Sequence, residues 1–289
     1  MTRLRGGLIA VACSLILLSA GCAQGKAADD AGDGGPSLLA DAVALRVSYT
    51  GGFVGADALV SRLPMLTIYG DGRVITEGPQ IAIYPGPALP NIQVQRISTV
   101  DVETLINRAL AAGVGTTLDY GQPPIADAPS TRFTVHTSAG VKTAEANALG
   151  EATTGAGLTE AQVAARKKLQ DLLAALTDLP KTLGADKVSK SDPYQPVTLA
   201  VITREWVADN GVPGEQKPIA WPGAALPGES MGLNLGCVTA TGKELGRALD
   251  AAKGANTVTP WTSGGKSWTL TFRPLLPDET GCADLRRTS

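Results

Sequence analysis

The chain has 289 residues, of which 18% are charged and only 4% are aromatic, and its 25 basic residues nearly balance its 27 acidic ones. That balance, a formal charge of −2 at pH 7, excludes a protein that follows a nucleic-acid backbone with a broadly basic surface. The residues after position 41 form two stretches of roughly 140 and 95 residues, and each is long enough to bury a core.

The start of the chain is typical of a secretion signal. Arg3 and Arg5 provide a positive start, residues 8–18 form an apolar run, and small residues then lead to Cys22. The apolar run is shorter than the about 20 residues that a membrane-spanning helix needs. We therefore expect residues 1–21 to be a signal peptide that is removed on export.

Residues 18–22 (Leu-Ser-Ala-Gly-Cys) resemble the bacterial lipobox. The resemblance implies that the sulfur of Cys22 carries a diacylglyceryl group with palmitate-like chains, and that Cys22 becomes the first residue of the mature lipoprotein. Several acyl chains hold a protein at a bilayer far more firmly than one chain does. We expect a membrane anchor on the extracytoplasmic face, followed by a flexible tether over residues 22–41. The alternative is an ordinary secreted protein in which Cys22 has no such role.

Position in the chain separates the four cysteines. Cys13 lies in the expected signal peptide and Cys22 takes the lipid, which leaves Cys237 and Cys282. A remaining pair in an oxidising compartment predicts one disulfide bond. Two thiols and the single histidine, His136, do not supply the four ligands of a structural zinc site. We expect a structural disulfide, with no metal and no cofactor.

Residues 42–183 are predicted to form an N-terminal domain. Gly70-Asp71-Gly72 separates two apolar segments and predicts a hairpin, because Asp-Gly tolerates a positive φ. Helical spacing predicts a helix that Ser98 or Thr99 caps, and a second helix that begins at Thr159 with Gln162 as its capping-box partner. Alternation of apolar and polar residues predicts strands at 44–49, 65–69, 73–76, 81–84, 131–137 and 141–148.

Residues 181–193 are polar and lack a periodic pattern, which predicts the boundary to a C-terminal domain at 194–289. There we expect a strand at 197–202, a helix at 241–253 with Thr241 and Glu244 as its capping box, and a strand at 267–272. The mixture of strands and helices predicts an α+β fold of two small domains, each an antiparallel sheet with one or two packed helices.

We expect no catalytic site in this chain. His136 lies on the polar face of its expected strand, and we expect it to be a surface residue and not a member of a catalytic triad. Paired carboxylates are all that glycan hydrolysis requires, and these residue types are present without a diagnostic context. The candidates by type alone are Glu77, Asp119, Asp127, Glu145 and Glu205.

Four residues are candidates for contact with a ligand or a partner. Trp221 and Trp261 lie in segments rich in Gly and Pro, where an exposed indole stacks on a sugar or contacts a protein, and the alternative is that both anchor loops to the core. Tyr84 and Pro87 belong to a short proline-rich segment, which forms either a partner-facing edge or a rigid crossover from a strand to a helix. The run Arg166-Lys167-Lys168 is expected on the solvated face of its helix.

Two groups of segments resemble an uncharacterised actinobacterial family of secreted lipoproteins. The first comprises residues 66–75 (LTIYGDGRVI) and 126–129 (ADAP). The second comprises residues 261–265 (WTSGG), residues 273–279 (RPLLPDE) and Cys282. The resemblance covers most of the mature chain and implies placement in the cell envelope, but no activity and no functional residue.

Together these patterns predict a non-catalytic envelope lipoprotein that binds a protein or a cell-wall component and no nucleic acid. Two alternatives stay open. The first is an envelope glycan hydrolase that uses paired carboxylates. The second is an inhibitor or accessory protein that presents its proline-rich loops.

Overall fold

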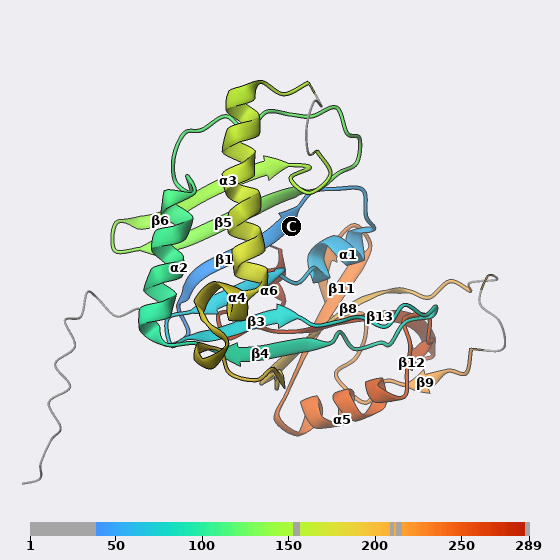
Figure 1. Cartoon of the computed structure of the whole chain (residues 1–289). Coiled ribbons are helices and arrows are strands. Elements are labelled where there is room, and N and C mark those ends of the chain that lie inside the picture. Colours follow the sequence, from blue (N-terminus) through green and yellow to red (C-terminus); the bar gives the residue numbers. More distant parts are fainter. Residues whose placement is uncertain (1–38, 153–156, 209–210, 212–215, 287–289) are drawn as a thin grey trace, which may run out of the picture. The chain divides into compact units, whose positions relative to one another are not determined.

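Two sheets with helices packed on them form the α+β fold that the sequence predicts (Figure 1). The computed structural model describes residues 39–152, 157–208, 211 and 216–286, which belong to the compact unit Pro36–Ser289. The expected signal peptide, the lipid site at Cys22 and nearly all of the expected tether lie outside the described residues. The division into two domains stays a prediction.

The first sheet has the strand order β6-β5-β1-β2-β3-β4-β7 among the described residues, and every pairing is antiparallel. The predicted hairpin is confirmed: Ile68 pairs with Val74, and Gly72 between them has a φ of +85°. A Cβ at Gly72 would lie 2.1 Å from the carbonyl oxygen of Ile97, so no other residue fits there. The strands are β1 (Val43–Thr50), β2 (Leu66–Tyr69), β3 (Arg73–Glu77), β4 (Ile92–Arg96), β5 (Ser130–Thr137), β6 (Gly140–Asn147) and β7 (Asp192–Pro193).

Helices α2 (Thr99–Ala111) and α3 (Glu160–Thr177) pack on one face of this sheet. Both predicted N-terminal caps are confirmed: Ser98 accepts a hydrogen bond from the Asp101 amide, and Thr159 and Gln162 form the capping box. Each helix buries an apolar stripe in a shared core with β1, β2 and β5. The stripe residues are Val102, Leu105, Ala109, Ala165, Leu169, Leu172 and Leu176.

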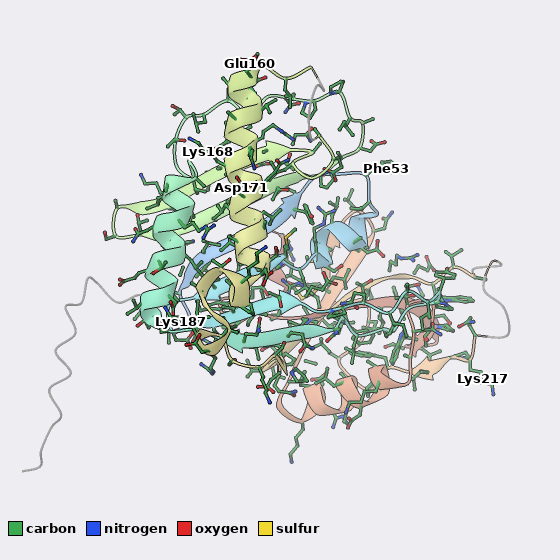
Figure 2. The ribbon with its side chains drawn as sticks, viewed as in Figure 1. Phe53, Glu160, Lys168, Asp171, Lys187 and Lys217 are labelled. Atoms are coloured by element: carbon green, nitrogen blue, oxygen red, sulfur yellow. A yellow bond between two sulfur atoms is a disulfide. The ribbon has the colours of Figure 1, made fainter. Side chains whose placement is uncertain are left out.

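The basic run on α3 is only partly solvated. Lys167 and Lys168 are exposed, and Figure 2 shows Lys168 and Asp171 on the outer side of the helix. Arg166 is buried instead, and its guanidinium donates to the carbonyls of Tyr120 and Ala148. The expectation for Arg166 is therefore wrong, because its position on α3 faces two loop carbonyls that need a donor.

The second sheet has the order β10-β11-β8-β13-β12-β9 among the described residues. It is antiparallel except for β9, which pairs with β12 in parallel. Helix α5 (Gly242–Lys253) covers one face, where Trp268, Leu270 and Phe272 share the core as predicted. The strands are β8 (Thr198–Glu205), β9 (Ile219–Ala220), β10 (Glu229–Gly232), β11 (Leu235–Thr241), β12 (Trp261–Ser263) and β13 (Lys266–Pro274).

The two sheets share apolar clusters on their other faces. Leu276, just after β13, packs with Val43, Tyr69 and other residues of the first sheet. Ala56 and Val60 of helix α1 (Ala56–Ser61) pack on the face of the second sheet that carries Cys237 and Cys282. The segment after β13 thus covers part of the first sheet, and α1 covers part of the second.

The predicted strand at 81–84 is wrong. Residues 78–91 form a loop, and the next strand is β4 (Figure 1). Pro79, Pro85, Pro87 and Pro90 lack the amide hydrogen that a strand ladder needs, which explains why the alternating apolar residues before Pro85 do not pair.

The expected boundary at 181–193 is not pattern-free. Helix α4 (Leu179–Leu183) and the 3-10 helix η1 (Ala185–Lys187) occupy its first part, and β7 then pairs with the edge strand β4. Asp178 starts α4 by accepting a hydrogen bond from the Lys181 amide. The segment is polar because it covers a sheet edge through its backbone.

The cap of α5 also differs from the prediction. Thr241 precedes the helix but makes no side-chain capping bond. The carboxylate of Glu244 instead accepts a hydrogen bond of 2.6 Å from the amide of Ala224. A tertiary donor therefore replaces the local one.

Candidate functional site

Trp221 and Trp261 are core residues, which corrects the expectation of contact with a ligand or partner. Both indoles are buried beside Phe272, with ring centroids 5.9 Å apart in an edge-on arrangement and with Trp261 5.4 Å from Phe272. The indole nitrogen of Trp221 donates to the carbonyl of Ala224 at 2.8 Å. Burial of the large apolar area of these two rings stabilises the core of the second sheet.

Tyr84 and Pro87 lie on the exposed side of the proline-rich loop. Ile81, Ile83 and Tyr84 are 60%, 56% and 65% exposed, and Pro87 is exposed as well. At one end of the loop, Gly78 donates its amide hydrogen to the carbonyl of Asn91. We call residues 81–84 and 87 the apolar loop.

Residues that follow α5 hold the apolar loop in place by binding its neighbours, Gly86 and Ala88. The amide of Ala88 donates to the carbonyl of Ala255, and the amide of Thr257 donates to the carbonyl of Gly86. Ala88 and Leu89 pack against the core that contains Trp221 and Trp261. The loop therefore joins two neighbouring strands of the first sheet, β3 and β4, contacts the core of the second sheet, and presents a fixed, exposed apolar edge.

The residues considered for catalysis lie apart from one another. His136 is half-buried, and burial together with the positive charge of Arg46 lowers its pKa against the opposing effect of Asp278. Burial raises the pKa of Glu145, but hydrogen bonds from Thr50 and Arg132 outweigh this and leave it below its ordinary value. Asp119 accepts hydrogen bonds from Gly121 and Gln162. Asp127 occupies a turn with a φ of +62°.

One groove is lined by two carboxylates. It has a volume of about 880 Å³ and lies between α1, the end of β8 and the β10–β11 hairpin. Asp57 of α1 and Glu205 of β8 both line it, and Arg204 pairs with Asp57 at 3.3 Å. Of the five carboxylates that the sequence singles out, Glu205 is the one that shares this groove with a second acid.

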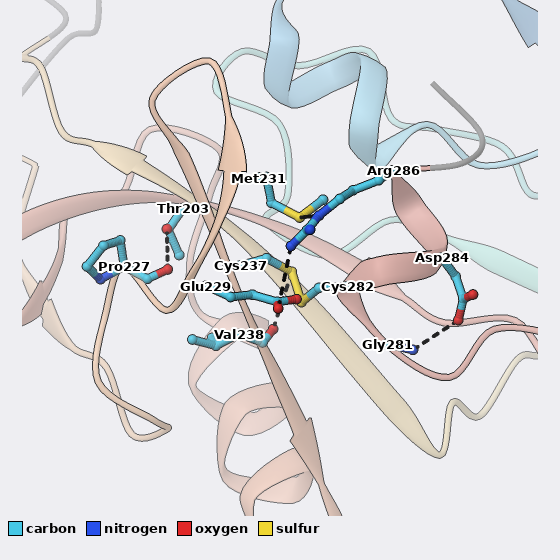
Figure 3. The surroundings of a disulfide bond; sticks show 10 residues. All are labelled: Thr203, Pro227, Glu229, Met231, Cys237, Val238, Gly281, Cys282, Asp284 and Arg286. Carbon is cyan, nitrogen blue, oxygen red and sulfur yellow. Dashed lines mark hydrogen bonds and ion pairs between the residues drawn. A yellow bond between two sulfur atoms is a disulfide. The ribbon is translucent and has the colours of Figure 1, made fainter.

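The predicted disulfide is confirmed. Cys237 of β11 and Cys282 of α6 (Cys282–Leu285) are bonded, with their Cα atoms 6.1 Å apart (Figure 3). An ion pair of 3.4 Å between Arg286 and Glu229 lies beside the bond. The disulfide thus ties the C-terminal turn to the sheet at β11.

A cluster of charged residues between the sheets was not anticipated. Both oxygens of Asp278 accept hydrogen bonds from Arg46 of β1, at 2.8 and 2.9 Å, and the Tyr69 hydroxyl donates to the same carboxylate at 2.6 Å. Burial and the charge of Asp278 raise the pKa of Tyr69 far above its ordinary value, so Tyr69 stays a donor. Asp278 lies 232 residues from Arg46 and 209 residues from Tyr69, and no local sequence pattern predicts such contacts.

A second ion pair in this cluster is fully buried. Arg273 of β13 donates from Nη2 to Glu279 at 2.8 Å and from Nη1 to the carbonyl of Pro274. The other oxygen of Glu279 accepts from the amide of Leu276 at 2.7 Å. Burial lowers the pKa of Arg273, and the charge of Glu279 opposes that effect.

The described residues also lack two features. No helix among them combines the length and the apolar character that crossing a membrane requires. The same residues contain no group of three or more His, Cys, Asp or Glu side chains placed to hold a metal ion. Comparisons of the chain with protein-family models, with curated proteins and with solved structures found no match.

Proposed function

We propose that this chain is a lipid-anchored protein of the cell envelope that binds a partner protein through the apolar loop and performs no catalysis. The lipobox-like residues before Cys22 support the anchor. The observation that carries the binding role is the exposure of three large apolar side chains, Ile81, Ile83 and Tyr84, on a loop fixed at both ends. An inhibitor or accessory role would use the same surface.

A fixed apolar edge suits protein recognition for a physical reason. Exposed apolar area that is contiguous gains free energy when a partner removes it from water. A loop that is already held in one conformation loses little conformational entropy on binding. The backbone bonds that join Ala88 to Ala255 and Thr257 to Gly86 supply that restraint here.

Site-specific photo-crosslinking in intact producing cells tests the binding role. A photoreactive residue in place of Ile83 is expected to yield a discrete crosslinked product with the full-length protein. The matched control is Val100, which is 69% exposed on α2 and equally apolar. Equal labelling from both positions, or none from Ile83, would contradict the proposal.

The same strains test the anchor. The crosslinked product is expected in the membrane fraction, and Cys22→Ser is expected to move the full-length protein out of that fraction, because the sulfur that would carry the acyl chains is gone. A Cys22→Ser protein that stays in the membrane fraction would contradict lipid attachment at this residue. The crosslink at Ile83 tests the binding role, and its outcome does not depend on whether Cys22 carries a lipid.

A second candidate function is glycan hydrolysis in the groove, favoured by the presence of Asp57 and Glu205 in its lining. Such chemistry uses one carboxyl as acid and another as base or nucleophile. Glu205 takes part in none of the ion pairs among the described residues, whereas Asp57 is paired with Arg204.

Release of soluble glycan fragments from isolated cell walls measures this second activity. Under the hydrolase hypothesis, Glu205→Gln is expected to reduce release by about 100-fold, since one acid–base group contributes about that much. Glu103→Gln, on the exposed face of α2, is the matched control. An absence of release by the unaltered protein would exclude the hydrolase and leave the binding proposal standing.

A further inference from the structure

A small cavity opens where β1, α1 and the end of β13 meet. It has a volume of about 40 Å³, and its lining includes three arginines, Arg46, Arg62 and Arg273, together with Ser48 and Thr50 of β1. Glu279 also lines it. Gly51 at its rim is exposed, so the cavity reaches solvent.

Arg273 has a buried donor without an acceptor. Its Nη1 and Nη2 are bonded to Pro274 and Glu279, but its Nε has no hydrogen-bond partner among the described residues although it is shielded from solvent. The side chain is only 2% exposed. A buried N–H without a partner is costly, and most such groups in native proteins are satisfied by protein or by a bound species.

The charges around the cavity do not cancel. Asp278 is bonded to Arg46 and Glu279 to Arg273, and both oxygens of Glu279 are already in use. Arg62 donates to the carbonyl of Gly51 and belongs to no ion pair among the described residues. One positive charge is therefore left over.

We infer that this cavity binds the carboxylate group of a ligand. A cavity needs roughly 10–15 Å³ of such volume to hold one water molecule. The volume here therefore admits about three heavy atoms, the size of a carboxylate. Guanidinium groups bind carboxylates through charge-assisted hydrogen bonds. Ser48 lines the same space, and so does Thr50, whose hydroxyl already donates to Glu145. The ligand is either a small organic acid or the free C-terminal end of a peptide that extends past Gly51. This inference does not depend on the proposed function.

Titration of the full-length protein with ¹³C-labelled acetate, followed by NMR, tests the site. Acetate is expected to bind saturably, and neutral acetamide, which has the same shape, is expected not to bind. Arg62→Gln is expected to weaken acetate binding about tenfold, because it removes the unpaired positive charge. Arg108→Gln, an exposed arginine on α2, is the control that should leave binding unchanged.

A short peptide with a free C-terminus, compared with its C-terminal amide, distinguishes the two sources. Tighter binding of the acid form than of acetate assigns the peptide end, and acetate binding without a gain from the peptide assigns a small acid. Three results would overturn the inference: no saturable binding of acetate, equal binding of acetamide, or equal weakening by Arg62→Gln and Arg108→Gln. Arg62 is half-exposed, so its replacement leaves the buried pairs intact.

Discussion

Glu279→Gln is expected to lower the free energy of unfolding by about 3–5 kcal/mol, because it leaves the charge of Arg273 buried without its partner. Both side chains of this pair are almost completely shielded from water. The side-chain amide that the substitution introduces keeps an acceptor for Arg273 but cannot neutralise its charge. Chemical denaturation of the folded protein measures the change.

Two comparisons make this expectation specific. Asp250→Asn breaks an exposed pair with Lys253 on α5 and is expected to change stability very little. Replacing both Arg273 and Glu279 by methionine is expected to cost less than Glu279→Gln alone, because no unpaired charge is left in the interior. A Glu279→Gln protein as stable as Asp250→Asn would show that this pair does not carry the expected energy.

Removing the disulfide is expected to have the second large effect. The double variant Cys237→Ala and Cys282→Ala should lose roughly 3–4 kcal/mol, since the bond closes a loop across a sequence separation of 45 residues and restricts the unfolded chain. Alanine is chosen because both sulfurs lie in an apolar cluster. Denaturation with and without a reducing agent gives the measurement.

The reducing agent also supplies the control. It should destabilise the parent protein by a similar amount and leave the double variant unchanged. Destabilisation of the double variant by the reductant would show that the effect arises elsewhere in the chain.

Local elements were predictable where a local interaction decides them. The hairpin around Gly72 needs a positive φ next to two apolar segments, and the cap of α3 needs only Thr159 and Gln162. Apolar alternation likewise located β1, β5, β6 and β13. In each case the residues that stabilise the element lie within a few positions of one another.

Local patterns failed where distant segments compete for the same groups. Glu244 has the right position for a capping box, but the amide of Ala224 takes its carboxylate. Residues 81–84 alternate as a strand does, but the prolines that follow direct the chain across to Ala255 and Thr257. Arg166 is charged, yet its side chain is buried because it donates hydrogen bonds to two loop carbonyls.

The candidate sites divide in the same way. Tyr84 and Pro87 were singled out from composition and are exposed, and the pairing of Cys237 with Cys282 was predicted from their number and the expected compartment. For Trp221 and Trp261 the sequence left ligand contact and loop anchoring both open, and the structure shows anchoring, because burial of a loop side chain depends on the core that the loop meets. Glu205 was a candidate by residue type alone, and no signal in the sequence grouped it with Asp57 or pointed to the arginine-lined cavity.

By itself, the sequence determined the α+β class, about half of the strands, the three longest helices, two helix caps and the disulfide, because these follow from spacing, residue type and the count of cysteines. Tertiary structure alone decided which charges of distant segments meet. Arg46 and Asp278 are 232 positions apart, and their contact exists only because the segment after β13 folds back over the first sheet. Ion pairs between distant segments follow no sequence spacing, so their partners are fixed by the packing of the surrounding apolar residues.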